Sequence, residues 1–369
     1  MIPILIPDLP ITEQLLPWLQ RIDKARWYSN FGPLIQEFES QLISTFFSKQ
    51  STFLTTVSSG TTALELALSV LNLSPGRYAL TPALTFPATA IAIKQAGLSP
   101  IFTDIDPHTW LLTPEIAYQV LKKKSFDVVI PVATFGCPQP VEQWDKFSEE
   151  TGIPVLIDAA AAIGHQAIGQ YCITTFSFHA TKPFGIGEGG LVVAKSADFI
   201  KKVRKLSNFG FEEGIITQYG SNAKLSEYHA AVGLAQLKRW PQIIKHRQQI
   251  WQIYQQHFNK IQNKIHLQQT PQGFIPTILS VKINKLKKDR ILSTINYLTH
   301  QGIETRRWYC PPLTEHPAFE GMPQIAPNGN HLLKVTEELS HCLLGLPFHT
   351  SLNEEQIAYI CSILKSTTN

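Results

Sequence analysis

The sequence predicts an α/β protein with a mostly parallel central sheet covered by helices, followed by a smaller C-terminal α/β domain. From about residue 53 to residue 194, short apolar runs alternate with helical patterns, which is typical of a parallel sheet covered on both faces. The long helical stretch 226–258 then ends in the polar segment 259–273, after which strand and helix patterns resume. We therefore expect a large domain over 1–258 and a small domain over 259–369.

The strands of the large domain are expected where short runs of apolar and β-branched residues occur. These runs are 79–81, 100–103, 128–131, 155–157 and 175–178, with helices such as 142–151 between several of them. Ligands of such sheets bind beyond the carboxyl ends of the strands. Asp158 directly follows the run 155–157, so the sequence predicts a carboxylate at that edge.

The C-terminal part has weaker but similar patterns. A strand is expected at 278–281 and a helix at 289–301. A final helix is expected to begin at Ser351, with Glu354 three residues later completing a capping box.

Composition and charge favour a soluble, cytoplasmic enzyme. The 369 residues are 44% hydrophobic and carry a net charge of +4, so a large core is possible and the charge is mild. The basic cluster Lys201, Lys202, Arg204 and Lys205 lies in a helical pattern, which favours a solvated helix face over a nucleic-acid site. The scattered cysteines and histidines lack the spacing of metal ligands or of a disulfide framework. Neither a signal peptide nor a membrane-spanning run is expected.

Lys182 and Asp158 form the most informative pair of residues. Lys182 lies shortly before the glycine cluster 185–190, and Asp158 ends an apolar run. Pyridoxal phosphate chemistry requires a lysine that forms a Schiff base and a carboxylate that holds the pyridinium nitrogen. A surface lysine and a strand-end aspartate that caps a turn are the alternatives for each residue alone. Together, the two residues indicate a pyridoxal phosphate site.

A phosphate-binding turn is expected near Gly60 and Thr61. The segment 57–68 reads as a turn that opens a helix, and backbone N–H groups at a helix start bind anions. Ser177 could add a hydroxyl group to the same phosphate. Simple capping by Ser59 or Thr61 is the structural alternative, and it is compatible with phosphate binding.

The glycines 185, 187 and 190 also match the dinucleotide fingerprint G-x-G-x-x-G. That fingerprint requires a helix to open within the glycines, whereas a strand-like run, 191–194, follows here. We therefore expect the glycines to form a tight link that returns the lysine loop to the sheet.

At this point the chain resembles the DegT/StrS type of pyridoxal phosphate-dependent sugar aminotransferases, which have the fold of aspartate aminotransferase. The resemblance covers nearly the whole chain, and the order and spacing of its segments are specific. The similar segments are NFGP (30–33) with FE (38–39), SGT (59–61), TFPAT (85–89), DID (104–106), DAA (158–160), SFHATK (177–182), GEGG (187–190), GSNAKLS (220–226), AAVGLAQL (230–237) and LPF (346–348).

The resemblance implies a role for each matching residue. Lys182 would hold the cofactor covalently, and Asp158 would pair with its ring nitrogen. Phe86 would stack on the pyridine ring, and Asn222 would reach the phosphate of a partner subunit, which implies a homodimer with shared active sites. For Phe86 a core position, and for Asn222 a turn position, is the alternative. The phosphate itself would be held by Gly60, Thr61 and Ser177.

Two departures from the family pattern are visible, one at Ala161 and one at Lys224 and the region of Trp308 and Tyr309. The family usually has a glutamine, which contacts the cofactor's phenolic oxygen, where Ala161 stands. It often has arginine at Lys224, and a lysine offers a point charge rather than a two-pronged donor. It also often has a His-Tyr pair near Trp308 and Tyr309. These changes bear on the substrate more than on the cofactor.

The resemblance implies transfer of an amino group from an amino acid, expected to be L-glutamate, to a nucleotide-linked keto sugar. A 4-keto-6-deoxyhexose is the expected acceptor, and a 3-keto sugar is the alternative. Related sugar dehydratases carry histidine in place of the lysine, so Lys182 speaks against that class. A non-catalytic regulatory protein on the same fold would need an appended interaction segment, for which residues 1–30 look too short.

Overall fold

The computed structural model describes residues 1–48, 51–284 and 290–367. Its central sheet has the strand order β3-β2-β4-β5-β6-β7-β1, in which two hydrogen-bonded groups of strands are joined by the bridges Val129–Val155 and Val132–Asp158. Only β7 runs antiparallel to its neighbours in this sheet, so the prediction of a mostly parallel sheet is confirmed. The strands are β1 (Phe53–Val57), β2 (Tyr78–Pro82), β3 (Ser99–Thr103), β4 (Val128–Val129), β5 (Leu156–Asp158), β6 (Ile173–Ser177) and β7 (Gly190–Ala194).

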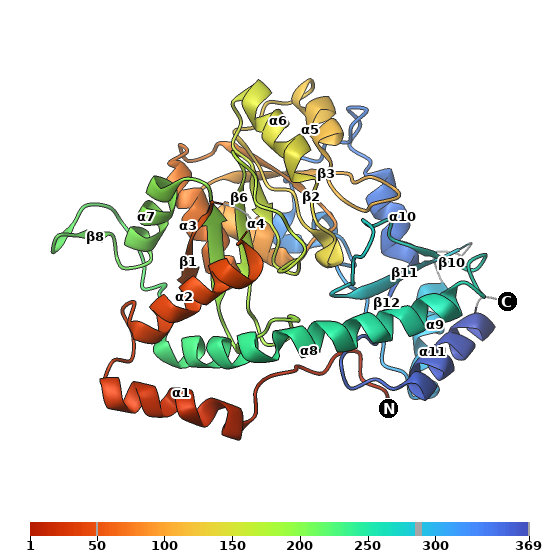
Figure 1. The fold of residues 1–369 in the computed structure, drawn as a ribbon. Coiled ribbons are helices and arrows are strands. Elements are labelled where there is room, and N and C mark those ends of the chain that lie inside the picture. Colours follow the sequence, from red (N-terminus) through yellow and green to blue (C-terminus); the bar gives the residue numbers. More distant parts are fainter. Residues whose placement is uncertain (49–50, 285–289, 368–369) are drawn as a thin grey trace.

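Helices cover both faces of this sheet because most of its strand residues are buried and apolar on both sides. One face packs on α2 (Pro33–Phe46), α5 (Pro114–Leu121), α6 (Val141–Thr151) and the first half of α8 (Glu227–Phe258). The other face packs on α3 (Gly60–Leu71), α4 (Pro87–Gln95) and α7 (Ala197–Leu206). The helix α1 (Thr12–Ala25) lies against α8 (Figure 1).

The C-terminal part forms a second, antiparallel sheet in the order β10-β11-β12. Figure 1 shows α8 passing below the central sheet and on to this smaller sheet, and Tyr254 and Phe258 of α8 belong to its core. Ile2 pairs with Ile303, so the start of the chain also lies here. The elements of this part are β10 (Ile265–Leu267), β11 (Leu279–Ile283), β12 (Leu343–Leu346), α9 (Arg290–His300), α10 (Lys334–Cys342) and α11 (Glu354–Thr367).

The expected start of the final helix was wrong by a few residues. The helix α11 begins at Glu354, and its capping box pairs Asn353 with Gln356 rather than Ser351 with Glu354. An asparagine amide accepts from the third N–H as well as serine does, so the sequence offered two cap candidates. The expected helix 289–301 is α9, although residue 289 lies outside the described residues. Within the described ranges, no helix has the length and apolarity needed to cross a membrane.

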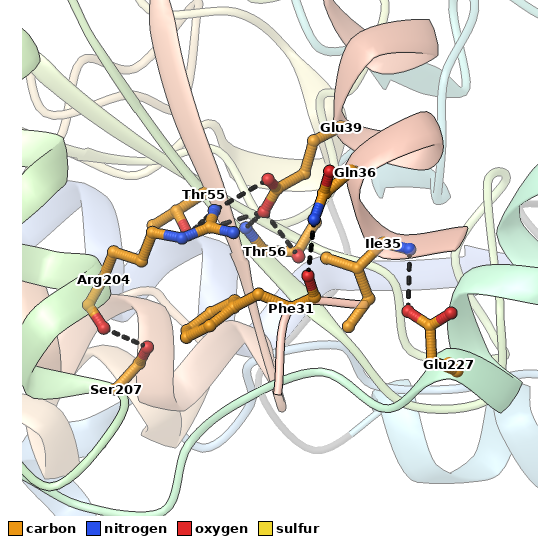
Figure 2. A network of polar contacts seen from close by, with 9 residues as sticks. All are labelled: Phe31, Ile35, Gln36, Glu39, Thr55, Thr56, Arg204, Ser207 and Glu227. Carbon is orange, nitrogen blue, oxygen red and sulfur yellow. Dashed lines mark hydrogen bonds and ion pairs between the residues drawn. The ribbon is translucent and has the colours of Figure 1, made fainter. Parts of the chain in front are cut away.

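A polar network ties the turn at Phe31 to the end of β1 (Figure 2). Glu39 accepts hydrogen bonds from the backbone N and the hydroxyl of Thr56, at 2.8 and 2.9 Å. Arg204 pairs with Glu39 at 2.8 Å and lies 4.0 Å from the centre of the Phe31 ring. The basic cluster was expected to lie on a solvated helix face, but Arg204 does not fit this expectation. Its pairing with Glu39 fixes the strand that leads to Gly60.

Candidate active site

The loop that carries Lys182 connects β6 to β7. It is closed by hydrogen bonds from Phe178 N to Gly189 O and from Ala180 N to Gly187 O, both 2.8 Å long. The glycine cluster returns the chain directly into β7, so the expected tight link is observed and no helix opens there to receive a pyrophosphate. The loop holds Lys182 at the edge of the sheet where β5 and β6 end.

Asp158 ends β5 and is buried, with 5% of its surface exposed. Its Oδ2 atom accepts a hydrogen bond from the Thr89 hydroxyl at 2.7 Å, and its Oδ1 atom accepts one from Ala160 N at 3.1 Å. Burial raises the pKa of Asp158, whereas these two hydrogen bonds and the charge of Lys182 lower it. The two bonds fix the orientation of the carboxylate, and among the described residues Lys182 is the cation that lowers its pKa.

Lys182 is the electrostatic partner of Asp158. Burial lowers the pKa of Lys182 below the ordinary 10.5, and the Asp158 carboxylate acts in the opposite direction. An amine that loses its proton more easily than a surface lysine is a better nucleophile at neutral pH.

Covalent attachment of pyridoxal phosphate to the apoprotein should therefore show a pH midpoint below 10.5, because the neutral amine of Lys182 is present at lower pH. Stopped-flow absorbance across a pH series measures the rate of attachment, with Nα-acetyl-lysine as the reference amine. A midpoint equal to that of the reference amine would contradict the role of burial.

The residues of the predicted phosphate turn lie together at the start of α3. Ser59 caps this helix by accepting from Thr62 N at 3.1 Å. The N–H groups of Gly60 and Thr61 have no hydrogen-bond acceptor among the described residues. A Cβ atom on Gly60 would lie 2.7 Å from the Cβ of Ser177, so only glycine fits there. The two free N–H groups at the helix start and the hydroxyls of Thr61 and Ser177 are the kinds of donor that bind a phosphate group.

Replacing Ser177 by alanine should weaken the affinity for pyridoxal phosphate by about 10- to 100-fold, because a hydrogen bond to a charged group contributes about 1.5–3 kcal/mol. Equilibrium titration of the apoprotein, followed by fluorescence, measures the dissociation constant. Ser69→Ala, at the exposed far end of α3, is the matched control and should leave the constant unchanged. Equal affinities for both variants would rule out Ser177 as a phosphate ligand.

Phe86 is not a core residue, because 59% of its surface is exposed. It precedes α4, and Thr89, one turn later, holds Asp158. Phe86 is the N-cap residue of α4 and has extended backbone angles, so its exposed ring lies at the start of the helix that carries Thr89. This place is compatible with stacking on the cofactor, which stays a prediction.

Asn222 is exposed, and its Oδ1 atom accepts a hydrogen bond from Lys224 Nζ at 2.8 Å. Because an ammonium group only donates, the amide NH₂ of Asn222 points away from Lys224 and is available to an anion. The next residue, Ala223, accepts from Ser58 N of the same chain at 2.8 Å. Asn222 thus lies near the phosphate turn of its own chain, while its predicted reach to a partner subunit stays a prediction.

Comparison with known proteins decides the family. Residues 10–365 match the model of the DegT/DnrJ/EryC1/StrS aminotransferase family. The chain belongs to this family. Membership confirms the predicted family, the predicted fold class and the predicted enzyme class, an aminotransferase that uses pyridoxal phosphate.

Similar proteins cover almost the whole chain. The GDP-perosamine synthase of Escherichia coli O157:H7 is 30% identical over 98% of this chain and 96% of its own length. The dTDP-4-amino-4,6-dideoxy-D-glucose transaminase of Shigella dysenteriae is 28% identical, with 97% of each chain covered. A crystal structure described as a PLP-dependent aminotransferase of Bacillus cereus ATCC 10987 has a TM-score of 0.91 and 31% identity, with 98% of this chain and 99% of that chain covered.

The residues present fit the cofactor of this family, with one group missing. The Ala161 side chain has no hydrogen-bond donor, and its carbonyl oxygen accepts from Thr277 Oγ1 at 2.5 Å. The donor that a glutamine would supply to the cofactor's phenolic oxygen is therefore absent at this position. Gly60, Thr61, Ser177, Asp158 and Lys182 otherwise offer the phosphate, ring-nitrogen and amine contacts that the cofactor needs.

Two neighbours of the site carried no role in the sequence reasoning. Thr89 orients Asp158 from a helix 69 positions earlier. The Tyr309 ring is stacked on Phe135 with 5.0 Å between ring centres, and its pKa is raised by burial and by the charge of Asp158. For Thr89 the available signal was its place in the segment 85–89, which resembles the family, whereas Tyr309 appeared only beside a departure from the family pattern.

Proposed function

We propose that this chain transfers the amino group of L-glutamate to a nucleotide-linked keto sugar, a 4-keto-6-deoxyhexose, in the synthesis of amino sugars for surface polysaccharides. The observation that carries the proposal is the pairing of half-buried Lys182 with buried Asp158 beyond the end of β5 in a chain of this aminotransferase family. The acceptor class is supported by the names of two relatives, a dTDP-4-amino-4,6-dideoxy-D-glucose transaminase and a GDP-perosamine synthase.

The side chains have separate tasks in this reaction. When bound, pyridoxal phosphate supplies an electron sink that stabilises negative charge on the carbon next to the nitrogen. The Asp158 carboxylate keeps a ring nitrogen protonated by favouring its charged form. The Lys182 amine, once displaced by the donor, carries a proton as a general base and returns it as a general acid. The turn at Gly60 and Thr61 holds the phosphate group in place during both half-reactions.

A panel of nucleotide sugars tests the acceptor. The holoenzyme is incubated with L-glutamate and with dTDP- or GDP-linked 4-keto-6-deoxyhexoses, and products are separated by chromatography and identified by mass. We expect amination of a 4-keto sugar. Amination of 3-keto sugars only would move the proposal to the alternative acceptor, and a dehydrated product without nitrogen would place the chain among the dehydratases.

We also propose that the protein is a cytoplasmic homodimer with shared active sites. The five cysteines are unpaired, in keeping with a reducing compartment. The hairpin of β8 (Phe211–Glu212) and β9 (Ile215–Ile216) projects from the molecule (Figure 1). It exposes 69% of the Ile215 surface and 58% of the Ile216 surface. Apolar side chains gathered on a projecting arm favour contact with another protein surface, and a second copy of the chain is the proposed partner.

Mixing an inactive Lys182→Ala chain with an inactive Asn222→Ala chain should restore activity. In a mixed dimer, one site combines native Lys182 of one chain with native Asn222 of the other. Random exchange in a two-fold dimer gives about a quarter of the wild-type activity. Subunit exchange is verified by native mass spectrometry. Full exchange without recovery would show that Asn222 acts within its own chain, where Ala223 already contacts Ser58.

A further inference from the structure

Arg247 lies where the long helix α8 passes from one core to the other. Ile243 belongs to the core beneath the central sheet, whereas Ile250 belongs to the core of the C-terminal part. Arg247, between them, is buried with 6% of its surface exposed. Ligand sites occur preferentially at such junctions between two packed units.

The guanidinium group of Arg247 is only partly used by the protein. Its Nη2 atom donates to Pro276 O at 2.7 Å and to Thr277 O at 3.1 Å, and the group lies 4.7 Å from the centre of the Phe348 ring. Across the described parts of the chain, Arg247 forms no ion pair, and its hydrogen bonds are made by Nη2 alone. By contrast, Arg239, two turns earlier on α8, is paired with Asp8.

Arg247 and Lys182 line the same cavity. Asp8 lies on its wall too, but the Asp8 carboxylate is already engaged by Arg239 and by the Thr350 hydroxyl. Burial lowers the pKa of Arg247 to about 10, so the group keeps its charge at neutral pH. Arg247 thus contributes a cation without a direct ion pair, whose charged form the Asp8 carboxylate favours, and its Nε and Nη1 atoms remain as donors. The lining residues of the cavity are Leu5, Ile6, Pro7, Asp8, Thr181, Lys182, Pro183, Ile243, Arg247, His349 and Thr350.

We propose that Arg247 binds the α-carboxylate of the amino donor in this cavity. A guanidinium group binds a carboxylate through two parallel hydrogen bonds. The α-carboxylate is one bond from the carbon whose proton Lys182 moves, so a cavity lined by both side chains suits it better than the distant carboxylate of glutamate. This inference rests on the proposed function. It gives Arg247 a role in the half-reaction with the amino donor and none in the half-reaction with the keto sugar, because a keto sugar carries no α-carboxylate.

The test compares L-glutamate with 4-aminobutyrate, which keeps the distant carboxylate but lacks the α-carboxylate. Spectroscopic titration of the holoenzyme gives the donor concentration for half conversion of the cofactor. Arg247→Met should weaken the response to L-glutamate by roughly 10- to 100-fold, while the weak response to 4-aminobutyrate changes less than about threefold. Arg247→Lys should recover part of the loss. Lys245→Met, which removes a cation from the exposed side of the same helix, is the control.

A binding measurement separates recognition from folding. Calorimetric titration with glutarate, a dicarboxylate without an amine, should show binding to the wild-type protein that Arg247→Met weakens at least about tenfold. Thermal unfolding and cofactor absorbance verify each variant, and Arg247→Lys gives the same comparison if the methionine variant does not fold. If Arg247→Met discriminates between the two donors as the wild-type protein does, or binds glutarate equally well, the inference is overturned and the proposed function is not. A wild-type protein that accepts no amino group from any donor contradicts the proposed function, and the inference with it.

Discussion

Lys182→Ala should abolish covalent attachment of the cofactor and lower turnover by at least about 1,000-fold, since the variant lacks both the nucleophile and the proton carrier. The alanine variant can still bind pyridoxal phosphate through the turn at Gly60, so its visible spectrum should be that of the free aldehyde. Absorbance before and after borohydride reduction, followed by peptide mass mapping, measures this.

Lys201→Ala is the control for this experiment, because Lys201 lies on the exposed side of α7. The control should keep the full borohydride adduct and the full turnover. An adduct on any lysine other than Lys182 in the wild-type protein would contradict the assignment of the site.

Asp158→Asn should retain the cofactor and lose turnover by about 100- to 1,000-fold, the usual cost of removing one preorganised electrostatic group. An amide cannot favour the protonated ring nitrogen as a carboxylate does. Single-turnover conversion of the bound cofactor with L-glutamate measures the rate of the first half-reaction.

Thr89→Val is the graded control for Asp158. It removes the 2.7 Å hydrogen bond to Oδ2 and the 3.1 Å hydrogen bond between the Thr85 and Thr89 hydroxyls. Loss of the first bond raises the pKa of the carboxyl further and should slow the half-reaction by less than about tenfold. A near-normal rate in Asp158→Asn would mean that the carboxylate is structural, whatever the Thr89 variant does.

The fold was predictable because its strands carry an unusually clear signal. Runs such as those of β6 and β7 are buried at every position, so they appear in the sequence as continuous apolar or β-branched segments. The first residue of a helix depends on which of several candidate residues caps it. A local sequence pattern does not show whether Ser351 or Asn353 caps α11. The pair Lys182 and Asp158 could be predicted from the sequence, because pyridoxal phosphate chemistry needs both a lysine that forms a Schiff base and a carboxylate that holds the ring nitrogen.

The supporting residues could not be found in the same way. Thr89 and Asp158 are 69 positions apart, and Glu39 and Arg204 are 165 positions apart. Such contacts are created by the packing of α4 and α7 on the sheet, not by a local pattern. Arg247 shows the limit most clearly, because a lone arginine in a polar helix is typical of a solvated face, and only the fold reveals that it is buried beside Lys182.

Isotope transfer tests the central claim most directly. The holoenzyme is given L-glutamate labelled with ¹⁵N at the amino group together with the accepted 4-keto-6-deoxyhexose nucleotide. The account predicts a nucleotide amino sugar that carries the label, one 2-oxoglutarate for each labelled product, and no labelled product from Lys182→Ala. Formation of 2-oxoglutarate without ¹⁵N in any sugar, or equal transfer of ¹⁵N by Lys182→Ala, would contradict it.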